Sequence, residues 1–509
     1  MYSVPWVALL AVPFFLLTAK YIYRLLLSPL SCFPGPRFAA CSKLFEAYHV
    51  LIKNDWLDML EALHHEHGSV VRIGPNELHF SDHQFCLQHH KRPDLYKCDN
   101  YYGILSYLLG GFADPAHHKT RKAILQPLFS GRTLADFSDS GMSAHLDTLV
   151  DRLSESSHAV VNTTHNLWAF TTDVMMSYVL GIETGYLKSQ DLKAVHDSTR
   201  AFSAIDLATV LRSMPPIKMV FDCVPSLRCF SPLGWIDQVI APSPSEPGLA
   251  NSWTIANPNQ KISNNLKLIK SNSVHEKGQK SVLAMLSQQL PEEHVLIHEL
   301  AQAVFIGNES LLSNLTVLLH HLIKNPDCIR RIRAELDEID VGLYGHRIWR
   351  DPKVIRLKYL DAVCRESTRM SAPGWHRQPR QVSTLVEHGQ YTIPPMTSLS
   401  FTLKLLEHDP TLYPEPLKFK PERWLETNPD SAAMKRSSVT FGTGTRTCLG
   451  QFIAHQVLRR TVAALVYNFS MTFSDELSDE MGGYTYLNAY PKKSHEGYLK
   501  LHFTPRFSP

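Results

Sequence analysis

The chain has 509 residues, of which 44% are hydrophobic and 19% are charged, and its formal net charge is +3. This composition excludes a disordered or collagen-like chain, and the near-neutral balance gives no basic footprint for nucleic-acid binding. The nine cysteines show no CxxC spacing, which argues against a zinc finger or a disulfide scaffold. We therefore expect a large folded protein that does not bind nucleic acid.

The N-terminal segment is apolar. Residues 4–19 carry no charge, and the apolar character continues beyond them with only Lys20 and Arg24 as interruptions. Sixteen helical residues span about 24 Å of the roughly 30 Å hydrocarbon core. We expect a single-pass transmembrane anchor over 1–27, followed by a proline-rich hinge over 28–37. No Lys or Arg precedes the apolar run, which favours a cytosolic location for the chain that follows it. A cleaved signal peptide is the alternative interpretation of this segment.

The remaining residues, 38–509, show helical patterns with a few short strands. Residues 69–80 form two apolar runs around Gly-Pro-Asn, which predicts a β-hairpin. Residues 115–230 are mainly helical in pattern. Residues 231–262 are rich in Pro, Ser and Asn. This segment has three possible interpretations: a long loop, a lid or a retained intron.

The C-terminal half continues the helical pattern and contains no βαβ rhythm. In chain order we expect a helix over 292–322, a helix from Asn325-Pro326 to Ile339, a helix over 359–370, strands within 379–402, irregular chain over 410–424 and a helix over 450–467. The predicted fold class is mainly α with minor β-sheets, in one large domain over 38–509.

A glycine-rich loop with one cysteine, FGTGTRTCLG, precedes the last helix. Gly442 and Gly444 permit tight turns and close approach of the backbone to a flat ligand. A thiolate at Cys448 would feel the positive end of the helix that follows. Arg446 offers a planar guanidinium suited to a carboxylate. Taken alone, such a loop is also compatible with a buried free cysteine at a helix start.

The loop resembles the cysteine-ligand loop of the cytochrome P450 family, FxxGxRxCxG, at every defining position. Three further segments match the family in order: Glu366-Ser367-Thr368-Arg369 resembles its ExxR helix, Pro421-Glu422-Arg423-Trp424 its PER[FW] segment, and residues 306–310 loosely its oxygen-binding helix. The anchor and hinge resemble those of microsomal members. The resemblance covers essentially the whole chain and implies a single large haem domain of the cytochrome P450 fold with an N-terminal membrane anchor.

The resemblance implies a haem b cofactor, iron protoporphyrin IX, with Cys448 as the axial ligand of the haem iron. Phe441, Gly442, Gly444 and Gly450 would shape the cofactor-binding loop. The propionates would be held by Arg446 together with three residues of other segments, namely His117, Arg121 and Arg380, because cations pair well with carboxylates.

Two further groups of residues receive roles from the resemblance. Glu366, Arg369 and Arg423 would form a structural triad behind the haem; alone, an i,i+3 pair of this kind is often a weak surface ion pair. Glu309 and Ser310 match the catalytic acid–alcohol pair that relays protons. Ile306 stands where the family usually has a small residue, and Ser310 stands where it usually has threonine. How efficiently electron consumption is coupled to oxygen insertion is therefore open.

The function that follows is haem-thiolate monooxygenation, with O2 and a lipophilic small-molecule substrate. About 60 residues follow Cys448, so we expect electrons to come from NADPH through an external partner, the NADPH–cytochrome P450 reductase. Lys119, Lys122, Lys435 and Arg436 are candidate contacts for that acidic partner. The expected location is the endoplasmic reticulum membrane, with the catalytic domain in the cytosol.

Several segments resemble filamentous-fungal members that oxidise secondary metabolites, in particular the trichodiene-oxygenase-like group, which implies a terpenoid or polyketide substrate. Two alternatives remain. One is a haem-thiolate enzyme for a non-hydroxylating step such as isomerisation, dehydration or oxidative ring coupling. The other is a non-catalytic haem binder.

Overall fold

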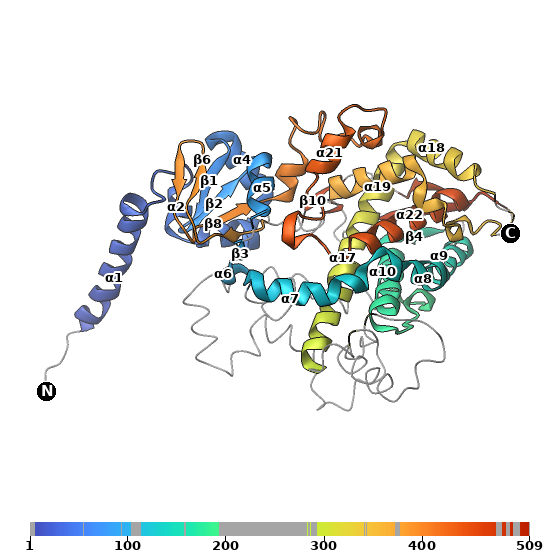
Figure 1. Ribbon diagram of the computed structural model, residues 1–509, viewed down its shortest axis with the longest axis horizontal. Coiled ribbons are helices and arrows are strands. Elements are labelled where there is room, and N and C mark those ends of the chain that lie inside the picture. The colour runs from blue at the N-terminus through green and yellow to red at the C-terminus, as the bar shows by residue number, and fades with distance from the viewer. Residues whose placement is uncertain are drawn as a thin grey trace.

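The computed structural model describes residues 6–53, 55–92, 94–102, 113–156, 159–192, 293–340, 344–371, 377–474, 481–484, 489–491 and 499–507, besides the single positions 282, 286 and 342. Helices dominate the described part of the chain, and the strands are short (Figure 1). The predicted fold class is confirmed. The segment 231–262, which the sequence left open, lies outside the described residues.

The helices of the first part of the chain are α1 (Trp6–Ile22), α2 (Arg37–Cys41), α3 (Leu44–Ala47), α4 (Trp56–His67), α5 (His83–His90), α6 (Asp99–Tyr102), α7 (Pro115–Leu125), α8 (Gly131–Phe137), α9 (Ser143–Glu155) and α10 (Thr163–Leu180). Those of the later part are α17 (Glu293–Lys324), α18 (Pro326–Asp337), α19 (Lys358–Ser371), α20 (Leu403–Glu407), α21 (Ser431–Ser437) and α22 (Gln451–Asn468). The expected helices at 292–322, 325–339, 359–370 and 450–467 are therefore confirmed within a few residues.

The strands form four sheets. A five-stranded sheet has the order β1 (Val70–Gly74), β2 (Glu77–Phe80), β8 (Ser398–Phe401), β5 (Arg380–Gln381) and β3 (Tyr96–Lys97). A second has the order β4 (Val160–Asn162), β12 (Lys500–Pro505) and β9 (Phe469–Phe473), and two hairpins pair β6 (Val386–His388) with β7 (Tyr391–Ile393) and β10 (Met481–Tyr484) with β11 (Ala489–Pro491). The predicted hairpin at 69–80 is the antiparallel pair β1–β2.

The long helix α17 runs through the middle of the molecule, and α10, α19 and α22 pack around it (Figure 1). All residues of α10 are buried. The helix therefore contributes side chains to the main core along its whole length. The five-stranded sheet contributes to a second core, separate from the main one.

The apolar N-terminal segment forms α1 and a short continuation over Tyr23–Leu27, and it extends away from the main body (Figure 1). Phe14 and Phe15 are each 71% exposed. In the part of the chain that the structure describes, we find no helix with both the length and the apolar character that crossing a bilayer requires. The transmembrane anchor expected at 1–27 is thus not supported.

Candidate active site

The cysteine loop is a compact turn closed by backbone hydrogen bonds. The Cys448 N–H donates to the Phe441 carbonyl over 2.8 Å, and the Gly442 N–H donates to that of Val439 over 2.8 Å. Gly444 has a φ of +68°, and a Cβ there would lie 2.3 Å from the His90 carbonyl oxygen at the end of α5. Only glycine fits this position. The loop is therefore fixed both by its own turn and by its contact with α5.

Cys448 lies deep in the protein yet keeps accessible surface. Burial raises the pKa of its thiol, because the charged form is poorly solvated there; an N–H of Gly450 and the charge of Lys122 act in the opposite direction but do not outweigh burial. A bound metal cation would reverse this balance, since coordination deprotonates a thiol. The position therefore suits a metal ligand with one open side.

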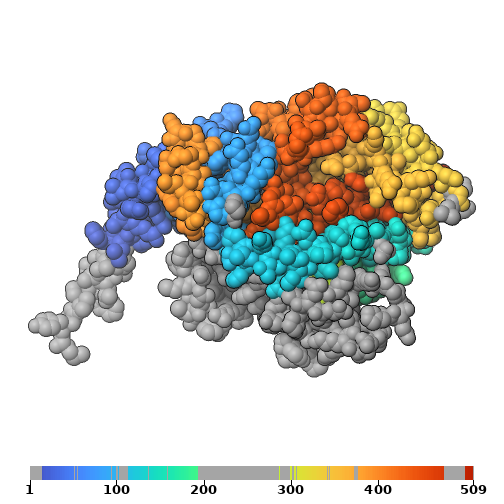
Figure 2. Space-filling view, viewed as in Figure 1, coloured from blue at the N-terminus to red at the C-terminus, as the bar shows by residue number. Residues whose placement is uncertain are grey.

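Helix α7 lies against the cysteine loop, and in Figure 2 its cyan band borders the orange-red part of the chain. The Lys122 ammonium donates to the carbonyls of Thr445 over 2.7 Å and Thr447 over 3.3 Å. Lys122 is therefore bonded to the loop that carries Cys448, and its expected contact with a reductase stays a prediction.

His117 and Arg121, the two residues expected on α7 to hold the propionates, both lie beside carboxylates of the protein. The His117 side chain is 80% exposed, with Nδ1 3.6 Å from the Asp114 carboxylate. The Arg121 guanidinium lies 3.6 Å from the carboxylate of Glu299 on α17. The inward-facing histidine is instead His118, which is 6% exposed.

Burial and then the charges of Arg446 and Lys97 lower the pKa of His118 to about 3. The pair that faces the loop is thus His118 and Lys122, which has the same four-residue spacing as His117 and Arg121. Sequence spacing alone cannot distinguish the two pairs, because adjacent residues differ only by the rotation of the helix.

Arg446 of the loop belongs to a cluster of cations with Lys97 and Arg380, of which Arg380 is buried. Strands β3 and β5 place Lys97 opposite Arg380, and the Arg380 Nη1 donates to the Tyr102 hydroxyl over 2.5 Å. Burial, with the charges of Arg380 and Arg446, lowers the pKa of Lys97. Burial and Arg380 also lower the pKa of Arg446 to about 10. Like charges this close are costly unless an anion joins them, so the cluster suits a ligand with carboxylate groups.

Glu366, Arg369 and Arg423 come together as a fully buried triad. The Arg369 guanidinium donates two hydrogen bonds to Glu366, over 2.9 and 3.0 Å, and Arg423 Nε adds a third over 3.0 Å. The Trp424 indole N–H also donates to Glu366, over 2.8 Å. Burial alone would raise the pKa of Glu366, but these hydrogen bonds and charges lower it overall. The triad links α19 to the chain that leads into the cysteine loop.

The middle of α17 carries the expected acid–alcohol pair. Ser310 Oγ donates to the carbonyls of Ile306 over 2.8 Å and Gly307 over 3.2 Å. Ile306 is 47% exposed although the helix beyond Ser310 is buried, so its side chain faces open space. A Cβ on Gly307 would lie 2.5 Å from Met175 Cε of α10. The glycine therefore allows α17 and α10 to approach each other.

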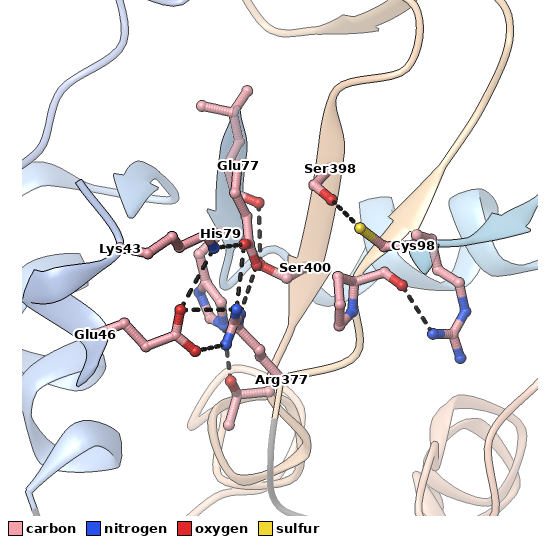
Figure 3. A network of polar contacts seen from close by, with 12 residues as sticks. Lys43, Glu46, Glu77, His79, Cys98, Arg377, Ser398 and Ser400 are labelled. Carbon is pink, nitrogen blue, oxygen red and sulfur yellow. Dashed lines mark hydrogen bonds and ion pairs between the residues drawn. The ribbon is translucent and has the colours of Figure 1, made fainter. Parts of the chain in front are cut away.

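A buried ion cluster that sequence reasoning did not find holds the chain just before β5 (Figure 3). Arg377 Nε lies 2.5 Å from a Glu77 oxygen, and its Nη2 lies 2.9 Å from a Glu46 oxygen. Lys43 Nζ lies 2.5 Å from the other Glu77 oxygen. These cations lower the pKa of Glu77 well below its usual range even though burial opposes them. Since Arg377 is three residues before Arg380, the cluster holds in place the backbone that leads to Arg380.

Other proteins resemble this chain along most of its length. The family model described as "Cytochrome P450" matches residues 257–487. The chain is 27% identical over 489 residues to the cytochrome P450 monooxygenase pbrB of Penicillium brasilianum, which covers 93% of both chains. It is also 28% identical to the conidiogenone synthase PchP450 of Penicillium rubens, over 90% of this chain and 91% of that protein. The chain belongs to the cytochrome P450 family.

A third relative is the tryptophan 6-hydroxylase fscE of Fusarium equiseti, 28% identical over 94% of this chain and 92% of that protein. As a cytochrome P450 with relatives named as monooxygenases, the chain is an oxidoreductase. The family implies a haem cofactor, and two observations fit it: Cys448 has an open side deep in the protein, and Lys97, Arg380 and Arg446 form a cluster of cations suited to two carboxylates.

Proposed function

We propose that this cytochrome P450 inserts one oxygen atom from O2 into a lipophilic secondary-metabolite intermediate, a terpenoid or polyketide, with electrons from NADPH through an external reductase. The observation that carries the proposal is the open side of Cys448 in a loop that matches the family pattern, together with the cation cluster of Lys97, Arg380 and Arg446. The fungal relatives named for secondary-metabolite chemistry, such as the conidiogenone synthase, support the substrate class.

The proposed roles of the residues follow from their positions. Cys448 would bind the haem iron through its sulfur, and a bound haem would supply the activation of O2. Arg380, Arg446 and Lys97 would pair with the propionates, and we propose His118 for the role expected of His117. These groups would orient the cofactor through charge-assisted hydrogen bonds.

Arg121, also expected to hold a propionate, lies beside Glu299 on α17, and it would have to leave that carboxylate to serve in that role. On the same helix, Ser310 Oγ and the Glu309 carboxylate can hold and pass a proton. The Ser310 hydroxyl donates to the Ile306 carbonyl in this structure, so it would have to turn from the backbone to serve in that role. Ile306 would narrow the space on this face of α17.

Ile306 and Ser310 also favour a second candidate function, a haem-thiolate enzyme that catalyses a non-hydroxylating step. A serine bonded to its own helix is a poorer proton donor than a free hydroxyl. Labelled O2 distinguishes the two: incorporation of one labelled atom into product supports the monooxygenase, and product without label supports the second candidate. A protein that binds haem and turns over nothing would be a haem binder only.

We further propose the division into a membrane-associated segment over 1–27, a hinge over 28–37 and a catalytic domain over 38–509, with the domain in the cytosol at the endoplasmic reticulum. The exposed apolar side chains of α1 support membrane association. Deleting residues 1–27 should release the protein from the membrane fraction, and recovery of the truncated protein in that fraction would contradict this.

The decisive test is the CO difference spectrum of the reduced protein, with wild type beside Cys448→Ser. Wild type should show a strongly red-shifted Soret band that the variant lacks. Product formation from terpene, polyketide and tryptophan panels with reductase and NADPH then tests the substrate class. A haem-loaded wild type without the band would remove Cys448 as the ligand and the monooxygenase mechanism with it.

A further inference from the structure

A small cavity lies next to the cysteine loop, where α19, α21 and the first turn of α22 meet the chain that follows the triad. Its volume is about 100 Å³. It is lined by Arg365, Thr368, Trp424, Lys435, Ser438, Thr440, Phe441, Gly442, Gln451 and His455. The space is several times what one ordered water needs and well below the 300–1,000 Å³ typical of drug-sized ligands. It therefore suits a compact ligand of a few heavy atoms.

The charge of the lining has one sign. Arg365 and Lys435 line the cavity, and no carboxylate does. Arg365 Nε donates to Asp361 over 2.8 Å, but Asp361 also accepts from Arg459. One carboxylate between two guanidinium groups leaves an excess positive charge. Lys435 has no carboxylate partner among the described residues, so its charge is available to a ligand.

The neutral groups of the lining can donate hydrogen bonds. Ser438, Thr440 and Gln451 line the cavity, and Gln451 is the first residue of α22. The Ser438 hydroxyl donates to Glu407 over 3.3 Å and lies 3.2 Å from the Thr440 hydroxyl, so it would have to turn to meet an anion. His455 Nδ1 is buried with no hydrogen-bond partner in the described part of the chain. Burial and the charges of Arg459 and Arg365 lower the pKa of His455 to about 4. His455 lines the cavity, and an anion bound there would favour the protonated imidazole, so the pKa of His455 can report whether the cavity is occupied.

We propose that this cavity is an oxyanion site that binds one phosphate, sulfate or carboxylate group, held by Lys435 and Arg365. Two cations, several donors and the N-terminus of an 18-residue helix converge on a space of matching size. The ligand chemistry has two sources, a free inorganic anion or a carboxylate on the surface of a protein partner. The proposal rests on the cavity and does not require the proposed substrate.

The direct test titrates the purified haem-loaded protein with inorganic phosphate by calorimetry, at an ionic strength held constant with chloride. Lys435→Gln should weaken phosphate binding about tenfold, because it removes one charge-assisted contact. Arg436→Gln is the matched control: it removes the same charge from the next residue of α21, which does not line the cavity. Its dissociation constant for phosphate should stay within about twofold of wild type.

Two results would overturn the site. One is a wild type that shows no phosphate binding beyond that of chloride. The other is an equal loss in Lys435→Gln and Arg436→Gln, which would mean that phosphate responds only to the overall field of the surface. A local readout complements the titration: phosphate should raise the pKa of His455, followed by NMR of labelled histidine, in wild type and much less in Lys435→Gln. An unmoved His455 signal with wild-type binding would place the anion elsewhere.

A second arm separates the two sources and, unlike the first, rests on the proposed reductase. Phosphate is added while the reductase reduces wild type and Lys435→Gln. Slower reduction in wild type alone would mean that the site receives a carboxylate of the partner, with which phosphate competes. Unchanged reduction together with intact phosphate binding would mean that the site serves a free anion. Failure of all reduction would count against the proposed electron donor and would leave the calorimetric result standing.

Discussion

The burial of His118 shows which face of α7 is turned toward the cysteine loop. His117 and His118 are adjacent in sequence, yet one is 80% exposed and the other 6%. The sequence predicted a histidine and a basic residue four positions apart, and two overlapping pairs satisfy that spacing. A rotation of about 100° between neighbouring residues separates them. Burial of Leu125, seven residues beyond His118, fixes the inward face, and this could have been recognised from the apolar pattern.

We predict that His118→Ala weakens haem retention and that His117→Ala does not. Loss of one contact to a charged propionate should increase the rate of haem transfer to excess apomyoglobin about tenfold. The measurement is the decay of the Soret band at neutral pH. The opposite order of the two variants would restore His117 to the role that sequence spacing assigned to it.

Glu407 is a fully buried carboxyl beside the triad. It accepts the Val439 N–H over 2.6 Å, and Arg369 donates to its backbone carbonyl over 2.8 Å. Burial raises its pKa from 4.5 to about 7, although its hydrogen bonds and Arg369 oppose this. The folded state therefore binds the proton more tightly than the unfolded state, and stability is highest below pH 4.5 for this group and is lost as pH rises through 7.

Glu407→Gln should remove that pH dependence. Between pH 5 and 8 the wild type is expected to lose roughly 2–3 kcal/mol of stability through this one group. Thermal unfolding followed by circular dichroism should show a smaller fall in midpoint for the variant over this range. Glu426→Gln, an exposed carboxyl, is the control and should follow wild type. Identical slopes in all three proteins would mean that Glu407 titrates normally.

At the scale of elements, the packing of α17 on α10 depends on one glycine. The sequence predicted the helix over 292–322 and a mainly helical pattern over 115–230, and it marked Gly307 only as part of an oxygen-binding motif. In the structure the space above Gly307 is filled by Met175, a contact that joins positions 132 residues apart. No local pattern predicts such a contact, because it depends on the crossing geometry of two helices.

Gly307→Ala should destabilise the protein by about 1–3 kcal/mol, since the added methyl group meets Met175 Cε. A double-mutant cycle with Met175→Ala tests the cause. The double variant should lose at least 1 kcal/mol less than the two single losses added together. Strict additivity, measured by chemical unfolding, would show that the two side chains do not meet.

At the scale of the whole molecule, Arg377 joins distant parts of the chain. Glu46 precedes it by 331 residues and Glu77 by 300. The sequence offers the three charges but no pattern that pairs them, because their separation is set by the fold alone. The triad of Glu366, Arg369 and Arg423 could be anticipated, since a family motif carries it, whereas this cluster has no such signature.

Arg377→Met should cost about 3–5 kcal/mol, because Glu46 and Glu77 would be left buried with only Lys43 as a cation. Arg330→Met is the control, since Arg330 forms an exposed pair with Asp327 that is worth less than about 1 kcal/mol. Unfolding midpoints in urea provide the comparison. A loss for Arg377→Met no larger than for Arg330→Met would mean that the cluster rearranges without cost.

The parallel pairing of β2 with β8 has a consequence during synthesis. His79 lies opposite Ser400 in that sheet, so the ribosome adds more than 300 residues after β2 before its neighbouring strand exists. At about 5–20 residues per second this interval is roughly 15–65 s. Throughout it the edge of the β1–β2 hairpin has bare N–H and C=O groups, which attract strands of other chains. Slower translation should therefore lower the soluble yield, and chaperones that cover strand edges should restore it.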